Sequence, residues 1–355
     1  MNVLDQQANA GAGVVRADME VDEQALARWM RANVEGFSGP MTVLQFKGGQ
    51  SIPTYQITTP SHSYVLRRKP SGVLLKGAHS VEREAQVQQA LATVGFSVPK
   101  VFALCTDPAV LGTPFYVMER VEGRIFWDAT FAQVSAAERP LYFEAMNQTL
   151  AKLHSIEPSA VGLESYGKTG NYFSRQISRW TRQYLEDEAA GRNPDMDLLV
   201  QWLPEHIPAG DETRIVHGDF RCDNMIFHPV EPKVVAVLDW ELSTLGHPLA
   251  DFANHAMMYR MPPEIVAGLA GADLHSLNIP SESRYVQAYC ERTGRNSIPD
   301  WEFYIAFNFF RMASIFHGIK GRVIRGTAAS AHAQERAKSF PLLASLARKA
   351  LEACR

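Results

Sequence analysis

The chain has 355 residues, of which 46% are hydrophobic and 21% charged, the balance of an ordinary globular protein with room for two lobes or domains. No run of about 18 apolar residues occurs, so we expect no membrane span. The net charge is −3 and no concentrated basic face is evident, which argues against nucleic-acid binding.

The N-terminal residues and the cysteines predict a cytoplasmic protein. The four cysteines are scattered without CxxC spacing, so we expect neither a disulfide framework nor a zinc site, and the setting expected is the reducing cytoplasm. The first residues lack the cationic start and apolar core of a secretory signal. Residues 1–18 are predicted to be a disordered tail.

Residues 19–118 have the pattern of a small β-rich lobe. Asp22 is a candidate N-cap for a helix with Leu26, Trp29 and Met30 on one face. A second helix is predicted at 81–94, where Val87 and Leu91 have helical spacing. Short apolar runs predict strands at 41–46, 54–58, 64–68, 101–105 and 115–119.

Beyond a connector at 119–123, the remaining residues 124–355 are mainly helical. Long amphipathic helices are predicted near 136–154, 172–189 and 301–318. One insert, at 214–240, contains three short apolar strands in quick succession. The predicted class is therefore α+β, with a small β-rich N-terminal lobe and a larger helical C-terminal lobe.

The strand insert carries the polar residues of greatest chemical interest. Its first two apolar strands are joined by a polar loop containing Asp219 and Asn224, and its third strand ends directly in Asp239. We expect the three strands to bring these side chains to one end of a small sheet.

These three residue types are the parts that phosphoryl transfer requires. The reaction needs a carboxylate to accept the proton of the attacking hydroxyl, and hard oxygen ligands to hold Mg²⁺ against the phosphates. Asp219 is the candidate base, and Asn224 and Asp239 are the candidate metal ligands. Any one of them alone could be a turn residue, but the combination favours the site. His217 is predicted to be structural, with its ring holding the loop.

The motifs resemble those of the aminoglycoside phosphotransferase-like kinase family, especially the branch found alone in bacteria or fused to acyl-CoA dehydrogenases. The resemblance runs from about Val43 to the C-terminal helices. It implies a protein-kinase-like fold with two lobes, ATP and Mg²⁺ as cofactors, and a small-molecule hydroxyl acceptor. The segments that carry it are His217-x-Asp219-x4-Asn224, Leu238-Asp239-Trp240-Glu241 and Gly246-His247-Pro248-Leu249-Ala250-Asp251-Phe252-Ala253.

By resemblance, three further segments bind the nucleotide. The turn containing Gly49, Gln50 and Ser51 would cover the phosphates, although glycine turns between strands are usually only turns. The connector would bind adenine through the main chain of Glu119 and Val121. Asp251 would brace the catalytic loop.

Arg67 stands where the family has its phosphate-pairing lysine. A partner for Arg67 follows from helical spacing, because Glu84 lies on the apolar face of its predicted helix with Val87 and Leu91. A carboxylate there is costly unless it is paired, so we predict an Arg67–Glu84 ion pair. The alternative is that Glu84 lies at the edge of the face and reaches solvent.

The acceptor is predicted to be anionic. Residues 256–355 contain 13 Lys and Arg against 8 Asp and Glu, whereas a polycationic aminoglycoside needs an acidic surface. Lys320, Arg322 and Arg325 are candidate acceptor-binding residues, and a hydroxylated acyl-CoA is a candidate acceptor. The alternative is that these three cations form a solvated face.

Two other functions remain open at this level. A metal-dependent phosphohydrolase could use His217, Asp219, Asp239 and His255 as ligands. That function leaves Asn224 and the predicted ion pair unexplained. A nucleotide-binding pseudokinase without turnover would not require Asp219.

Overall fold

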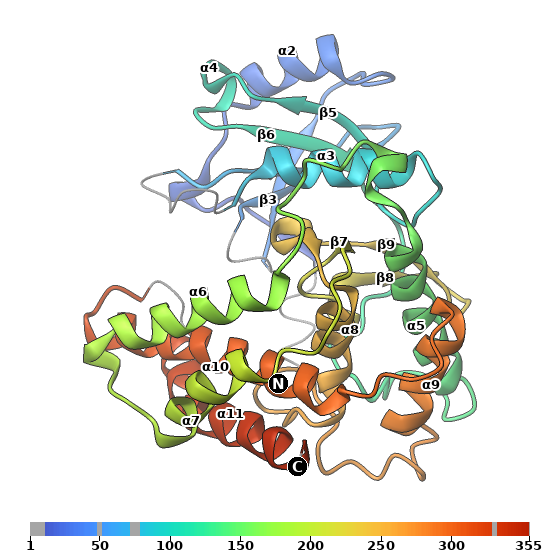
Figure 1. Ribbon diagram of the computed structural model, residues 1–355. Coiled ribbons are helices and arrows are strands. Elements are labelled where there is room, and N and C mark those ends of the chain that lie inside the picture. The colour runs from blue at the N-terminus through green and yellow to red at the C-terminus, as the bar shows by residue number, and fades with distance from the viewer. Residues whose placement is uncertain (1–10, 48–51, 72–78, 329–331, 355) are drawn as a thin grey trace. The chain divides into compact units, whose positions relative to one another are not determined.

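The computed structural model describes residues 11–47, 52–71, 79–328 and 332–354 (Figure 1). The chain forms two compact units. The sheet unit comprises Met1–Trp127 and Asp223–Ser243, and the helical unit comprises Asp128–Cys222 and Thr244–Arg355. The segment 223–243, which the sequence analysis assigned to the second lobe, therefore packs with the first.

An antiparallel sheet in the order β1-β2-β3-β4-β6-β5 is the centre of the sheet unit. Its strands are β1 (Ala12–Gly13), β2 (Thr42–Phe46), β3 (Thr54–Thr58), β4 (Ser63–Arg68), β5 (Val101–Cys105) and β6 (Phe115–Glu119). Five of the six were predicted to within one residue. The tail prediction fails for its second half, because Ala12 and Gly13 pair with Phe46 and Gln45 of β2. Residues 1–10 lie outside the described residues.

Alternating side chains divide the core of this unit between the two faces of the sheet. On one face, Leu26 and Met30 of α2 (Glu23–Asn33) pack with the cluster that contains Leu66 of β4. On the other face, α3 (Val81–Ala92) packs through Val81 with Val65 of β4. Figure 1 shows α2 and α4 (Pro108–Leu111) on one side of the sheet and α3 on the other. Side chains two residues apart on a strand point to the same face of the sheet, so Arg67 faces α3, as Val65 does.

The segment from the strand insert adds a hairpin to the sheet unit. Strand β8 (Met225–Phe227) pairs antiparallel with β9 (Val234–Val237), and Met225 lies opposite Val237. The hairpin is tied to the rest of the unit by reciprocal backbone hydrogen bonds between Arg124 and Phe227, both 2.8 Å long.

The helical unit is built around α10, which packs against α6, α8 and α11. Its helices are α5 (Arg139–Ser155), α6 (Tyr172–Glu186), α7 (Pro194–Glu205), α8 (Pro248–Ala256), α9 (Glu282–Thr293), α10 (Trp301–Ile324) and α11 (Ala333–Ala353). Nowhere in the described part of the chain is a helix both long enough and apolar enough to cross a bilayer.

One sequence expectation about the strand insert is wrong. Strand β7 (Arg214–Val216) does not join β8 and β9; it pairs antiparallel with β10 (Thr244–Gly246), a strand that the sequence analysis did not predict. The three strands therefore form parts of two separate two-stranded sheets, one in each unit. The physical reason is that the backbone groups of β7 are satisfied by a segment that follows Asp239 in the chain.

Candidate active site

The loop after β7, residues 217–222, carries the candidate base and is held by a buried carboxylate. Asp251 of α8 accepts hydrogen bonds from the backbone nitrogens of His217 (2.7 Å) and Gly218 (2.8 Å). Gly218 has a φ of +84°, a conformation that glycine adopts at low cost. The backbone of the loop is thus fixed directly before Asp219.

Asp251 is in turn held by the side chains behind it. His154 of α5 hydrogen-bonds to Asp251 Oδ2 through Nε2 (3.2 Å) and to the Tyr289 hydroxyl through Nδ1 (2.7 Å). Burial by itself raises the pKa of Asp251, but its hydrogen bonds with His154 and His217 hold that pKa below its ordinary value. The carboxylate is therefore ionised at neutral pH, and its charge strengthens the hydrogen bonds that it accepts from two backbone N–H groups.

Hydrogen bonds hold the backbone on either side of the peptide bond that joins Gly218 to Asp219. The fully buried His217 ring accepts a hydrogen bond from the Asp219 backbone nitrogen through Nδ1 (3.2 Å), which is a structural contact of the kind expected for this histidine. The carbonyl of Gly218 accepts from Arg311 of α10 (3.1 Å). Asp219 remains 30% exposed and forms a 3.4 Å ion pair with Arg221. A fixed backbone and an accessible carboxylate suit a proton acceptor.

The two candidate metal ligands lie at the same end of the β8–β9 hairpin. Asn224 immediately precedes β8, Asp239 is the second residue after β9, and the Leu238 nitrogen donates to the Asn224 carbonyl (2.8 Å). Asp239 has a φ of +63°, a left-handed conformation that aspartate tolerates better than most residues. An amide oxygen and a carboxylate are hard ligands of the type that Mg²⁺ prefers, so this pair fits the ion chemically.

The predicted Arg67–Glu84 ion pair is present, with Arg67 Nε 3.2 Å from Glu84 Oε2. Arg67 also donates through Nη2 to Asp239 Oδ1 (2.9 Å), a contact across 172 positions of sequence. Glu84 is fully buried and accepts from the Tyr116 hydroxyl (3.0 Å). Burial raises the pKa of Glu84 to about 7, and the neighbouring Arg67 offsets only part of that shift.

The other nucleotide candidates are placed as follows. Glu119 ends β6 with an exposed side chain, and its backbone nitrogen donates to the Lys100 carbonyl (2.8 Å). Val121 follows it and is half-buried. The predicted phosphate-covering residues Gly49, Gln50 and Ser51 lie outside the described residues.

The three candidate acceptor-binding cations on and after α10 differ in their surroundings. Lys320 donates to the Ala190 carbonyl (2.6 Å), and Arg325 makes two hydrogen bonds to Asp187 (2.6 and 2.9 Å). Arg322 lines a cavity together with Arg179 and Arg182 of α6. Sequence reasoning missed these two arginines, although Arg175, Arg179 and Arg182 recur at helical spacing on α6.

The phosphohydrolase alternative is not supported by the surroundings of His255. Both of its ring nitrogens are hydrogen-bonded, Nδ1 to the Phe220 carbonyl (2.9 Å) and Nε2 to the Tyr285 hydroxyl (2.7 Å). Asp239 belongs to the other unit and is bonded to Arg67. Among the residues that the structure describes, no group of three or more His, Cys, Asp or Glu side chains could hold a metal ion.

Comparison with solved structures identifies the fold. A Ralstonia eutropha protein provisionally named an aminoglycoside phosphotransferase is 48% identical, with a TM-score of 0.86 over 94% of this chain and 99% of that one. The aminoglycoside phosphotransferase APH(4)-Ia, solved as a ternary complex with AMP-PNP and hygromycin B, is 14% identical with a TM-score of 0.60 over 92% of this chain and 98% of its own. The predicted α+β, protein-kinase-like fold class is confirmed.

Comparison with curated sequences gives a longer relative. Acyl-CoA dehydrogenase family member 10 of Mus musculus is 44% identical over 336 residues, which cover 94% of this chain but only 31% of that protein. The chain thus spans about a third of the length of this curated relative. The sequence model described as the phosphotransferase enzyme family matches residues 42–302. Since that match covers well over half of the sequence, the chain belongs to the phosphotransferase enzyme family.

Proposed function

We propose that the protein transfers the γ-phosphoryl group of ATP to a hydroxyl group of a small molecule. The observation that carries this proposal is the loop after β7, where Asp251 and His217 fix the backbone while the Asp219 carboxylate stays accessible. Membership of a phosphotransferase family supports the same chemistry.

In the proposed reaction, the acceptor oxygen forms a bond to the γ-phosphorus while the bond from that phosphorus to the β–γ bridging oxygen breaks. Asp219 takes the proton that the acceptor hydroxyl loses, and ADP leaves with the bridging oxygen. Positioning and charge stabilisation supply most of the catalysis in such transfers, so a rigid loop matters more than a strongly basic group.

For the nucleotide, we propose that Arg67 pairs with phosphate oxygens and that Glu84 holds Arg67 in place. Asn224 and Asp239 would hold Mg²⁺, which when bound offsets the negative charge of the phosphates. The backbone of Glu119 and Val121 would bind the adenine, and the turn at residues 49–51 would cover the phosphates. The AMP-PNP complex of a protein with the same fold supports a nucleotide site.

For the acceptor, we propose an anionic molecule with an apolar part, such as a hydroxyacyl-CoA. The excess of cations after residue 255 and the relative named as an acyl-CoA dehydrogenase family member support this choice over a polycationic aminoglycoside. The setting proposed is the cytoplasm.

The test is an assay of ADP release with a panel of hydroxyacyl-CoA acceptors and one aminoglycoside, read together with the mass gain of one phosphate on the acceptor. Asp219→Asn should lower kcat by roughly 10²–10⁴-fold, the usual contribution of a general base. Asp273→Asn, which changes an exposed carboxylate of the same unit, is the matched control and should retain activity.

Three results would contradict the proposal. Full activity in Asp219→Asn would remove its role as base. Phosphate release from monoesters without nucleotide, together with tightly held zinc, manganese or iron, would favour a phosphohydrolase. Nucleotide binding with no turnover on any acceptor would favour a pseudokinase.

A further inference from the structure

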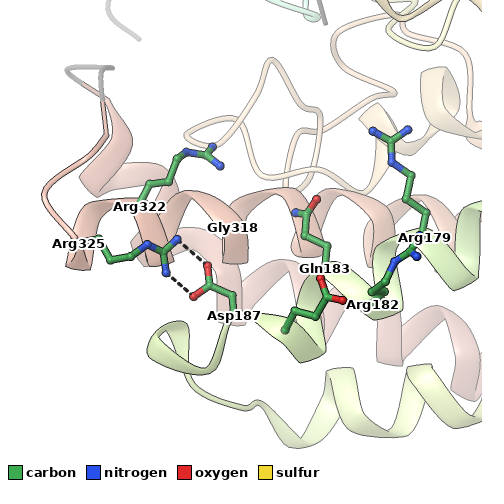
Figure 2. A pocket seen from close by; sticks show the side chains of 8 residues that line it. Arg179, Arg182, Gln183, Asp187, Gly318, Arg322 and Arg325 are labelled. Atoms are coloured by element: carbon green, nitrogen blue, oxygen red, sulfur yellow. Dashed lines mark hydrogen bonds and ion pairs between the residues drawn. The ribbon is translucent and has the colours of Figure 1, made fainter. Parts of the chain in front are cut away.

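An open surface pocket of about 490 Å³, which we call the cavity, is lined by residues of α6 and of the C-terminal half of α10 and by residues that follow these helices (Figure 2). Its lining contains four arginines and two acidic residues, which gives a local formal charge of +2. The residues that line it are Arg179, Arg182, Gln183, Glu186, Asp187, Gly318, Arg322 and Arg325.

One of the four arginines is neutralised within the protein. Arg325 makes two parallel hydrogen bonds to Asp187 (2.6 and 2.9 Å). These hydrogen bonds are the main reason why the pKa of Asp187 is lowered. Arg325 therefore forms a wall of the cavity, and its charge is already balanced. The only other carboxylate in the lining is that of Glu186.

The other three arginines are free to serve a ligand. No hydrogen bond or ion pair joins the guanidinium groups of Arg182 and Arg322 to another described residue, and Arg179 lies over the ring of its neighbour Trp180 (5.0 Å). In Figure 2 the side chains of Arg179 and Arg322 extend to the same side, with Gln183 between them. All three side chains are exposed, so solvent screens their mutual repulsion, and an anion that accepts from them would gain charge-assisted hydrogen bonds.

Two glycines let the helices approach closely enough to form this cavity. A Cβ atom at Gly318 would lie 2.9 Å from Gln183 Nε2, and a Cβ atom at Gly321 would collide with the Asp187 carboxylate. Gln183 uses the space by donating to the Ser314 carbonyl of α10 (3.0 Å). The cavity wall is thus fixed by side-chain-to-backbone contacts.

The same helix connects the cavity with the loop that carries Asp219. Arg311, which donates to the Gly218 carbonyl, precedes Arg322 by eleven residues, so the two lie on the same face of α10 about 16 Å apart along the axis. The Tyr172 hydroxyl at the start of α6 lies within electrostatic reach of Arg311, Arg175 and Arg179, and also of the opposite charge of Asp251. Arginines of both α6 and α10 therefore lie between the loop and the cavity.

We propose that this cavity is a phosphate-binding site in which Arg179, Arg182 and Arg322 hold the phosphate-bearing end of the acceptor, while its hydroxyl lies at Asp219. The proposal rests on the proposed function. It selects an acceptor whose phosphate and hydroxyl groups lie at opposite ends of an extended chain, because Arg322 follows Arg311 by eleven residues of α10, a rise of about 16 Å. It also reassigns the acceptor role from Lys320 and Arg325, which are engaged within the protein, to two arginines of α6.

The test is calorimetric titration of the full chain with three probes: CoA, pantetheine, which lacks the phosphates, and inorganic pyrophosphate. Saturating Mg²⁺ and AMP-PNP occupy the nucleotide site, and their own binding is measured first, so that a failure of the proposed nucleotide chemistry is seen separately. The variant is the double substitution Arg179→Gln and Arg322→Gln. The control is Arg284→Gln with Arg336→Gln, two exposed arginines of the same unit outside the cavity.

We expect CoA to bind the unaltered protein and the control equally, and to bind the double variant at least roughly tenfold more weakly, because charged hydrogen bonds to phosphate are lost. The affinity for pantetheine should be the same in all three proteins. Equal affinity of CoA for the control and the double variant would overturn the proposal. Binding of pyrophosphate without binding of CoA would also overturn it, because the site would then serve a free anion.

Discussion

Glu84 in the sheet unit and Asp251 in the helical unit are both buried carboxylates that contact candidate site residues of their own unit, but their pKa values move in opposite directions. Asp251 accepts hydrogen bonds from two backbone N–H groups and from His154, and its pKa is lowered. Glu84 has one ion pair and one hydroxyl donor, and its pKa is raised to about 7.

The difference between the two carboxylates shows what offsets burial. Fixed backbone donors point at both oxygens of Asp251, whereas Glu84 Oε1 has no hydrogen-bond partner among the described residues. A nearby positive charge alone does not replace a full set of donors. Asp251 is therefore suited to a permanent structural charge, and Glu84 to a charge that can be lost near neutral pH.

Asp251→Asn should have the largest effect. The amide cannot accept from both backbone N–H groups and would direct its own N–H₂ group at a donor, so we expect the free energy of unfolding to fall by about 3–5 kcal/mol. Urea unfolding measures the loss. Asp273→Asn is the matched control, because Asp273 also accepts from a backbone N–H, that of Ser276, but is exposed. A loss no larger than that of the control would show that burial adds nothing to these hydrogen bonds.

Buried histidines of the helical unit show the effect of burial on a group whose charged form is positive. Burial lowers the pKa of His255 and of His247 to about 4, below the value near 6.5 of an unfolded chain. Below pH 6.5 the unfolded state binds the extra protons, so stability falls as the pH drops from 6.5 to about 4, by about 3 kcal/mol for each group.

Urea unfolding at pH 7.5, 6 and 5 measures this slope. His255→Asn should reduce the dependence of the free energy of unfolding on pH by the contribution of one histidine. His275→Asn, which changes an exposed histidine, should leave that dependence unaltered. An equal slope in the His255 variant and the unaltered protein would show that His255 does not resist protonation in the folded state.

Glu84→Gln should have the smallest effect on stability, and it tests directly whether the two carboxylates differ. Because the pKa of Glu84 is about 7, the side chain is partly neutral at that pH, and we expect a loss of only about 1–2 kcal/mol there. The pH dependence of the free energy of unfolding that Glu84 contributes has the opposite sign to that of the histidines. The folded state holds the Glu84 proton more tightly than the unfolded state, so this group's contribution to stability declines as the pH rises from about 4.5 to 7.

The stability of Glu84→Gln relative to the unaltered protein should therefore improve as the pH rises over this range. Unfolding curves of both proteins at pH 5, 6 and 8 provide the measurement. A relative stability that worsens with rising pH would mean that the Arg67 charge outweighs burial, and that Glu84 resembles Asp251 after all.

Much of the fold and part of the site could be predicted from local patterns. Helical spacing along α3 placed Glu84 on an apolar face where it needs a partner, the family resemblance indicated Arg67, and the ion pair is present. The hydrogen bond from Arg67 to Asp239 was not predicted, because no local pattern links positions 172 residues apart. The pairing of β7 with β10 was missed for the same reason.

Periodicity and short-range spacing were enough to predict most helices and strands, the family motifs and the residue types of the candidate site, although β1 and β10 were missed. The side chains that hold Asp251 itself, His154 and Tyr289, and the arginines of α6 that share a cavity with Arg322 were visible only in the folded structure. The physical reason is that burial and hydrogen-bond partners, which set charge and pKa, come from segments distant in the chain.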